Sequence, residues 1–102
     1  MDDLIITKQL DGNRLTVSAE GRIDTKTAPQ LDNEVFRSLD GVTELVLDFS
    51  DTSYISSAGL RVLLAFYKTM NAKKGSFALR NANDTIRDLI ELTGLTDFLT
   101  FE

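Results

Sequence analysis

The sequence contains no cysteine and no histidine among its 102 residues. Without cysteine, this chain forms no disulfide, no thiolate zinc site and no cysteine nucleophile. Without histidine, it can build neither a Ser–His–Asp triad nor a histidine-ligated metal site, and it lacks imidazole acid–base catalysis. We therefore expect no cofactor and no metal, and we expect the protein not to be an enzyme.

Basic residues are also scarce, because 11 Lys and Arg stand against 16 Asp and Glu, for a net charge of −5. The longest basic run is Lys73–Lys74. Phosphate backbones and anionic lipid heads repel such a chain, which predicts neither a nucleic acid nor a membrane partner. Long apolar runs are absent, and the acidic pair Asp2–Asp3 near the start has the wrong charge for an export signal. We expect a cytoplasmic protein.

Apolar residues make up 42% of the chain, enough for one core and a single domain over residues 1–102. Alternation and apolar runs predict strands, and helical spacing predicts helices between them. The predicted strands are 4–10, 14–20, 45–49 and 77–81. The predicted helices run from 28 to Gly41, from the Ser56–Ser57 turn to about Ala72, and across Ile86, Leu89 and Ile90 to Gly94. Thr27 and Gln30 have the spacing of a capping box for the first helix. This order predicts an α/β sandwich with a mixed sheet of about four to five strands.

The segment 54–64, YISSAGLRVLL, places Ser56 and Ser57 at the start of the long apolar helix. The first backbone N–H groups of a helix have no internal partner and carry partial positive charge. A serine there is either a helix cap or a hydroxyl held where a phosphate is stabilised. These residues alone leave both interpretations open.

The longer segment 47–64, LDFSDTSYISSAGLRVLL, resembles the phosphorylation-loop signature of anti-sigma factor antagonists, which belong to the STAS domain family. The resemblance extends to GRIDT at 21–25, to Ala-Pro at 28–29 and to LTGL at 92–95. It covers nearly the whole chain in the expected order, and it implies a small STAS-type sandwich with helices packed on a mixed sheet.

The resemblance also implies a partner-switching role. In that family the unphosphorylated protein binds a GHKL-type anti-sigma factor serine kinase and frees a sigma factor; the kinase then phosphorylates a serine, and a PP2C-type phosphatase reverses the reaction. Matched to this sequence, the acceptor falls on Ser57, with Ser56 as the alternative, and the acidic residue of the first βα loop falls on Asp24. We expect Asp24, Ser56, Ser57, Gly59 and Arg61 to bind the partner. Arg61 lies one turn after Ser57, where it can pair with the phosphate.

Three other functions can be weighed against the sequence, and two of them lack residues that they require. A receiver-like domain would use Asp48, but Asp2 and Asp3 precede the first strand and no lysine follows the strand at 77–81. A hydrolase lacks a base to activate Ser57. A STAS adaptor or scaffold that regulates another signalling partner, with or without phosphorylation, remains the alternative to an anti-sigma factor antagonist.

Overall fold

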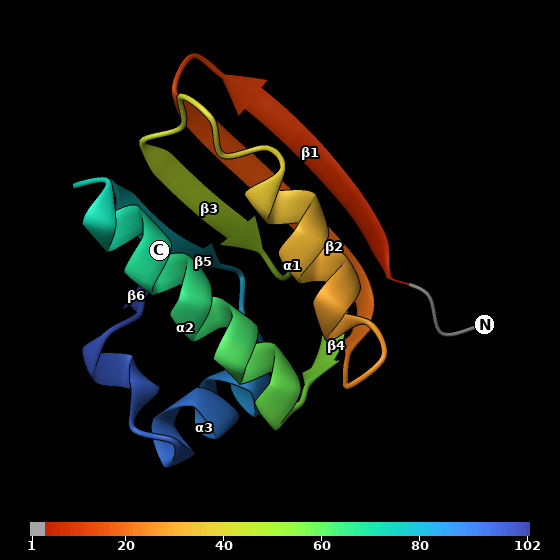
Figure 1. Ribbon diagram of the computed structural model, residues 1–102. Coiled ribbons are helices and arrows are strands. Elements are labelled where there is room, and N and C mark those ends of the chain that lie inside the picture. Colours follow the sequence, from red (N-terminus) through yellow and green to blue (C-terminus); the bar gives the residue numbers. More distant parts are fainter. Residues whose placement is uncertain (1–3) are drawn as a thin grey trace.

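The computed structural model describes residues 4–102, so the expectation based on Asp2 and Asp3 lies outside the described residues (Figure 1). Strands and helices alternate along most of the chain. Their bounds are β1 Ile5–Asp11, β2 Arg14–Ile23, α1 Ala28–Phe36, β3 Glu44–Asp48, β4 Thr52–Ile55, α2 Ser57–Ala72, β5 Ser76–Arg80, α3 Asp84–Leu92, the 3-10 helix η1 Leu95–Asp97 and β6 Thr100–Phe101.

The sheet has the strand order β1-β2-β3-β5-β6, and β4 pairs with β2 beyond the end of β3. Among the strands within residues 4–102, only the β1–β2 hairpin is antiparallel, and its turn contains Gly12 at φ +62°. The other pairs are parallel. The mixed α/β sandwich is confirmed, with two short strands, β4 and β6, in addition to the four predicted ones. Neither was predicted, because each has four residues or fewer, and so short a segment does not show a clear alternation of apolar and polar residues.

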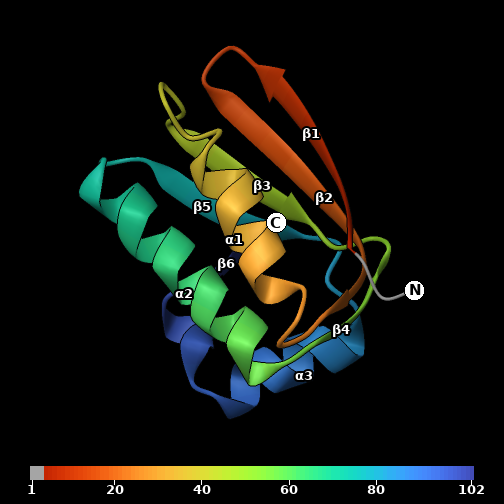
Figure 2. The ribbon, with the colours of Figure 1, turned by 45° about the vertical axis from the view of Figure 1, so that its right-hand side comes forward.

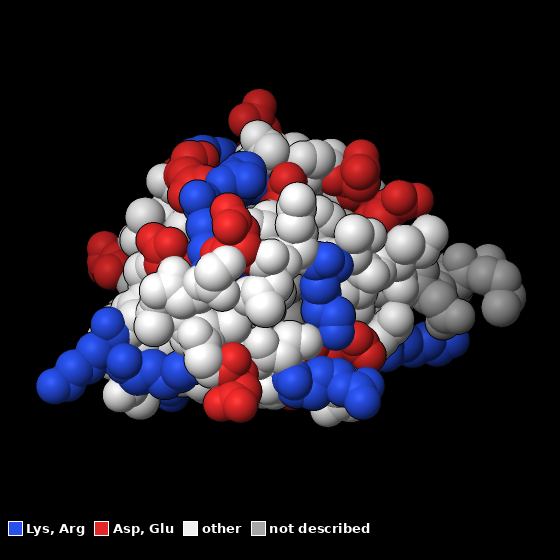
Figure 3. Space-filling model, turned by 90° about the horizontal axis from the view of Figure 1, so that it is seen from above, with Lys and Arg blue, Asp and Glu red and all other residues white. Residues whose placement is uncertain are grey.

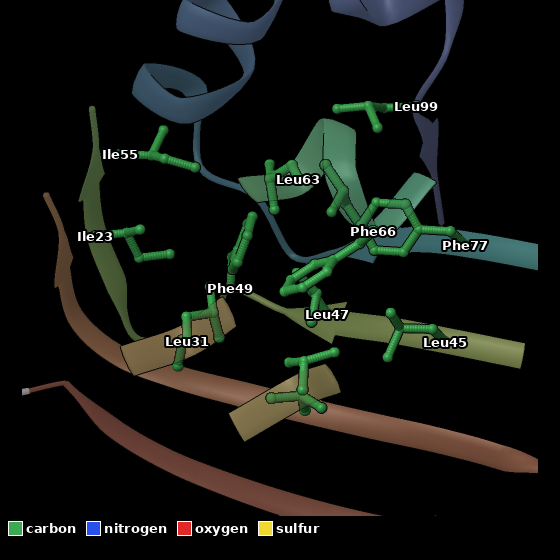
Figure 4. Packing of buried hydrophobic residues seen from close by; sticks show 14 of the residues in the cluster. Ile23, Leu31, Leu45, Leu47, Phe49, Ile55, Leu63, Phe66, Phe77 and Leu99 are labelled. Atoms are coloured by element: carbon green, nitrogen blue, oxygen red, sulfur yellow. The ribbon is translucent and has the colours of Figure 1, made fainter. Parts of the chain in front are cut away.

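Helices α1 and α2 lie side by side over one face of the sheet, and α3 packs near β4 and the start of α2 (Figures 1 and 2). The alternation predicted for β2 is confirmed: Leu15, Val17 and Ala19 are buried, whereas Thr16 and Ser18 lie on the opposite face. Figure 4 shows the core that results, with side chains from β3, α1 and α2 between the layers. Its largest fully buried members include Phe49 and Phe66, and the members labelled in Figure 4 also include Ile23, Leu31, Leu45, Leu47, Ile55, Leu63, Phe77 and Leu99.

The predicted capping box at the start of α1 is wrong. Thr27 has helical backbone angles and makes no side-chain cap bond, and the Gln30 amide instead donates to the Leu4 carbonyl at 2.9 Å. The reason is burial: Thr27 is 2% exposed, and its hydroxyl donates to the Arg22 carbonyl at 2.6 Å. The helix also ends earlier than predicted, at Phe36, because the chain then continues in turns up to Gly41.

The topology brings the first turns of α1 and α2 together. Each helix follows the carboxyl end of a strand, β2 or β4, and these two strands are paired and parallel. Both helices therefore start at the same edge of the molecule (Figure 2). The Ser56 N–H donates to the Ile23 carbonyl at 2.8 Å, which ties the start of α2 to the end of β2.

Candidate functional site at the start of α2

Ser56 and Ser57 have different environments. Ser56 is the N-cap of α2: its backbone is extended, at φ −93° and ψ 176°, and its Oγ accepts from the Gly59 N–H at 3.4 Å. Ser57 is the first residue of the helix, is exposed, and takes no part in the cap. The two interpretations left open by the sequence therefore apply to neighbouring residues. Ser56 is the cap, and Ser57 presents a free hydroxyl where the helix dipole favours an anion.

Gly59 allows the first turn of α2 to sit directly on the strands. A Cβ at this position would lie 2.6 Å from Ile55 Cγ1 and 2.7 Å from Ile23 Cγ2. Both isoleucines are 1% exposed or less, and Figure 4 shows them together at the edge of the core. Gly59 is buried in this contact. Its role within the chain is close packing, which sets the position of Ser57 relative to β2 and β4.

Asp24 organises the loop between β2 and α1. Its Oδ1 accepts from the Lys26 N–H at 2.9 Å and from the Thr27 N–H at 3.1 Å. The bond from the Thr27 N–H is the main cause that holds the pKa of Asp24 below its ordinary value of 3.8. The Asp24 N–H in turn donates to Thr27 Oγ1 at 2.8 Å. Within residues 4–102, all the hydrogen bonds to the carboxylate reach Oδ1, and none reaches Oδ2.

A groove lies between the first turns of α1 and α2, and we call it the α1–α2 groove. It has a volume of about 290 Å³. Its lining is mostly small and apolar, with two charged side chains, and consists of Thr25, Ala28, Pro29, Asp32, Ala58, Arg61, Val62 and Ala65. Ala58 directly follows Ser57, so the groove begins next to the exposed hydroxyl. The structure therefore places Arg61 in the groove, one turn beyond Ser57.

The structure brings together all five residues that we expected to bind the partner. The start of α2 contains four of them, Ser56, Ser57, Gly59 and Arg61. Asp24 directly follows Ile23, the last residue of β2, whose carbonyl accepts the hydrogen bond from the Ser56 N–H. Sequence reasoning missed Asp32 as a site residue. Its signal was its spacing of four from Ala28, since residues at this spacing lie on the same face of a helix.

Arg22 and Tyr54 also belong to this end of the molecule and were not anticipated. They are paired across β2 and β4, and the Arg22 guanidinium lies 4.5 Å from the centre of the Tyr54 ring. Stacking of this kind holds a cation in place near the loop that contains Asp24. The sequence could not show it, because the pairing depends on β4.

Asp48, the acceptor in the receiver-like alternative, has a structural role at the end of β3. Burial acts to raise its pKa, but hydrogen bonds from Ser50 and Asn81 outweigh burial, and the pKa of Asp48 is lowered. The Ser50 N–H donates to Asp48 Oδ1 at 3.0 Å, and the Asn81 amide donates to the same oxygen at 3.2 Å. These bonds close the loop that leads into β4.

The charges on one face of the molecule are mixed in sign. Figure 3 shows acidic and basic side chains interspersed over the face seen from above. Within residues 4–102, no helix has both the length and the apolar content needed to cross a bilayer.

The chain matches the STAS domain family over residues 5–102, and it belongs to that family. It is 30% identical over 101 residues to the anti-sigma-B factor antagonist of Listeria monocytogenes. The matched region covers 97% of this chain and 88% of that protein. The crystal structure of an anti-sigma factor antagonist from Mycobacterium paratuberculosis is also similar. It has a TM-score of 0.89 at 29% identity, covering 98% of this chain and 86% of the other.

The fold is shared with the anti-sigma factor antagonist SpoIIAA, which has been solved in two forms at 18% identity to this chain, each covering 96% of it. The unphosphorylated form has a TM-score of 0.83 and is covered over 88% of its length. The phosphorylated form, from Bacillus, has a TM-score of 0.76 and is covered over 91% of its length. The STAS fold expected from the sequence is therefore confirmed.

Proposed function

We propose that this protein is an anti-sigma factor antagonist that works by partner switching. Two kinds of relatives support the proposal: curated antagonists at 30% identity over nearly the whole chain, and a solved antagonist with closely similar structure. The observation that carries the proposal is the exposed Ser57 hydroxyl on the first residue of α2, beside a neighbour that already caps the helix.

In this proposal the unphosphorylated protein binds an anti-sigma factor, which releases its sigma factor. The anti-sigma factor is a serine kinase of the GHKL type. It transfers the γ-phosphoryl group of ATP to Ser57 Oγ: the new O–P bond forms, the bond to ADP breaks, and the hydroxyl proton is lost to the kinase or to water. A PP2C-type phosphatase hydrolyses the phosphoserine and restores the binding form. The protein itself catalyses no reaction and needs no cofactor.

Phosphorylation would act on the docking surface rather than on the fold. A phosphoserine adds about −1.5 to −2 charges and three acceptor oxygens. At Ser57 these meet the positive end of the α2 dipole, and Arg61, one turn later, can pair with them. The modified helix start is therefore stabilised. An acidic or apolar surface of the kinase packed against Ser57 would instead meet a bulky dianion, and like-charge contact at an interface costs several kcal/mol.

The remaining site residues have two roles in this proposal. Asp24 contacts the kinase through Oδ2, while Oδ1 holds the loop. Ser56 and Gly59 position the acceptor, the first by capping α2 and the second by letting it approach Ile23 and Ile55. The charge balance of −5 supports a protein partner rather than a nucleic acid or a membrane surface.

The experiment is mass spectrometry of the intact protein and its peptides after incubation with ATP and each GHKL-type kinase of the source organism. Wild type is run beside Ser57→Ala and Ser56→Ala. One phosphate that is lost only in Ser57→Ala supports the proposal with its acceptor. Loss only in Ser56→Ala moves the acceptor by one residue. If no kinase adds a phosphate although one binds tightly, the protein is instead a STAS adaptor or scaffold for another signalling partner.

A further inference from the structure

One carboxylate in the α1–α2 groove is not explained by the fold. Asp32 lies on α1, its Oδ1 is buried, and that oxygen has no hydrogen-bond partner within residues 4–102. Buried polar atoms in native proteins are nearly always paired, because an unpaired acceptor loses its water without compensation. A residue that lowers the stability of the isolated protein in this way is a candidate for a contact made only in a complex.

The charge of Asp32 is not balanced by its neighbours. Arg61 lines the same groove, but neither residue forms an ion pair within the part of the chain that the structure describes. The ion pairs found there involve only Glu34 and Glu102 as acids. The groove therefore has a negative charge at Asp32 and a positive charge at Arg61, and neither is in an ion pair within the described residues.

The rest of the groove suits an aliphatic stem. Its walls include Ala28, Pro29, Ala58, Val62 and Ala65, all small or branched apolar side chains, and its volume is about 290 Å³. Lysine and arginine bury their methylene stems on such surfaces and keep the charged head at a polar group. An ammonium or guanidinium bound to a carboxylate forms the stronger, charge-assisted type of hydrogen bond.

We propose that the α1–α2 groove receives a lysine or arginine side chain of the anti-sigma kinase, with Asp32 as its acidic partner. This inference rests on the proposed function. The groove starts at Ala58, next to Ser57, so a kinase that encloses the Ser57 hydroxyl also covers the groove. An acidic side chain is repelled by Asp32, and an uncharged apolar one leaves the carboxylate unpaired. Asp32 is thus a residue that determines partner specificity.

The test compares Asp32→Asn with Asp40→Asn, which removes the same charge from the exposed turn after α1. The probe is the kinase that phosphorylates Ser57, and the dissociation constants of the unphosphorylated variants are measured by calorimetry at two salt concentrations. We expect Asp32→Asn to bind at least about tenfold more weakly and with a smaller salt dependence. Asp40→Asn should bind like wild type. Thermal unfolding should show that Asp32→Asn is at least as stable as wild type.

A charge exchange makes the test specific. Asp32→Lys should lose binding, and one Lys→Asp or Arg→Asp variant of the kinase surface should restore it. Equal losses in Asp32→Asn and Asp40→Asn, or wild-type affinity in Asp32→Asn, would overturn the inference while phosphorylation of Ser57 still supports the proposed function. If no kinase phosphorylates Ser57 or Ser56, the proposed function fails and the inference fails with it.

Discussion

Replacing Gly59 by alanine tests whether the start of α2 is held by its close approach to β2 and β4. The added Cβ would lie 2.6 Å from Ile55 Cγ1 and 2.7 Å from Ile23 Cγ2, closer than real Cβ atoms approach their neighbours. Neither isoleucine can yield easily, because a β-branched side chain has few χ1 alternatives and both are fully enclosed by the core.

Two effects of opposite sign decide the outcome. Alanine is favoured over glycine inside a helix by at most about 1 kcal/mol. Forcing an extra carbon into a packed core costs about 1–3 kcal/mol. We therefore expect Gly59→Ala to lower the free energy of unfolding by about 1–2 kcal/mol. For a domain of this size, that corresponds to a fall in Tm of about 4–16 °C.

The measurement is chemical denaturation followed by circular dichroism. The m-values of the variant and wild type should agree, so that a shift in the midpoint reports a change in the free energy of unfolding. Ile55→Ala supplies the control background, because it removes the atom nearest to the new Cβ. In that background the Gly59→Ala substitution should cost less than in wild type, although Ile23 Cγ2 still lies 2.7 Å from the new Cβ. The smaller cost gives a favourable coupling in the double-mutant cycle. A Gly59→Ala single variant as stable as wild type would refute the packing role and leave partner contact as the reason for glycine.

Three further predictions concern the loops before α1 and α2. Ser56→Ala should lose about 1 kcal/mol of stability in denaturation, because the cap is lost, while mass spectrometry still finds phosphate on Ser57; loss of that phosphate would contradict the assigned roles. Thr27→Val should cost about 0.5–1.5 kcal/mol in the same denaturation assay, since it removes the hydrogen bond from the buried Thr27 hydroxyl to the Arg22 carbonyl; an unchanged midpoint would contradict this. The folded-state pKa of Asp24 is lowered, so its charge stabilises the protein above the ordinary value of 3.8, and this stability is lost as pH falls through the folded pKa. Asp24→Asn should therefore make Tm less sensitive to pH below 3.8, and an unchanged pH profile would count against the hydrogen bonds described.

The sequence predicted the parts of the fold that depend on regular spacing. The alternation of Leu15, Val17 and Ala19 with polar residues identified β2 and its buried face. The apolar rows of α2 identified a deeply packed helix that begins after Ser56 and ends at Ala72, as found. These features follow from local periodicity, because a helix or strand buries one face whatever else the chain does.

Features that depend on distant segments were missed. The strand β4 forms because β2 continues to Ile23, beyond the last residue of β3, and leaves its final residues free to pair. The Thr27–Gln30 pattern has the spacing of a capping box, but burial of Thr27 against the end of β2 gives its hydroxyl another partner. In both places tertiary contacts decided the local structure, and the local pattern alone could not show them.

By itself, the sequence determined the α/β class, the family signature and the position of the two serines at a helix start. Only the tertiary structure decided that Ser56 is the cap and Ser57 the exposed hydroxyl, and only it formed the groove that contains Asp32. The physical reason is twofold. Which serine caps the helix depends on the backbone angles at that residue, and these are known only once the end of β4 and the start of α2 are in place. The groove and the unpaired carboxylate arise where two helices separated in sequence pack together.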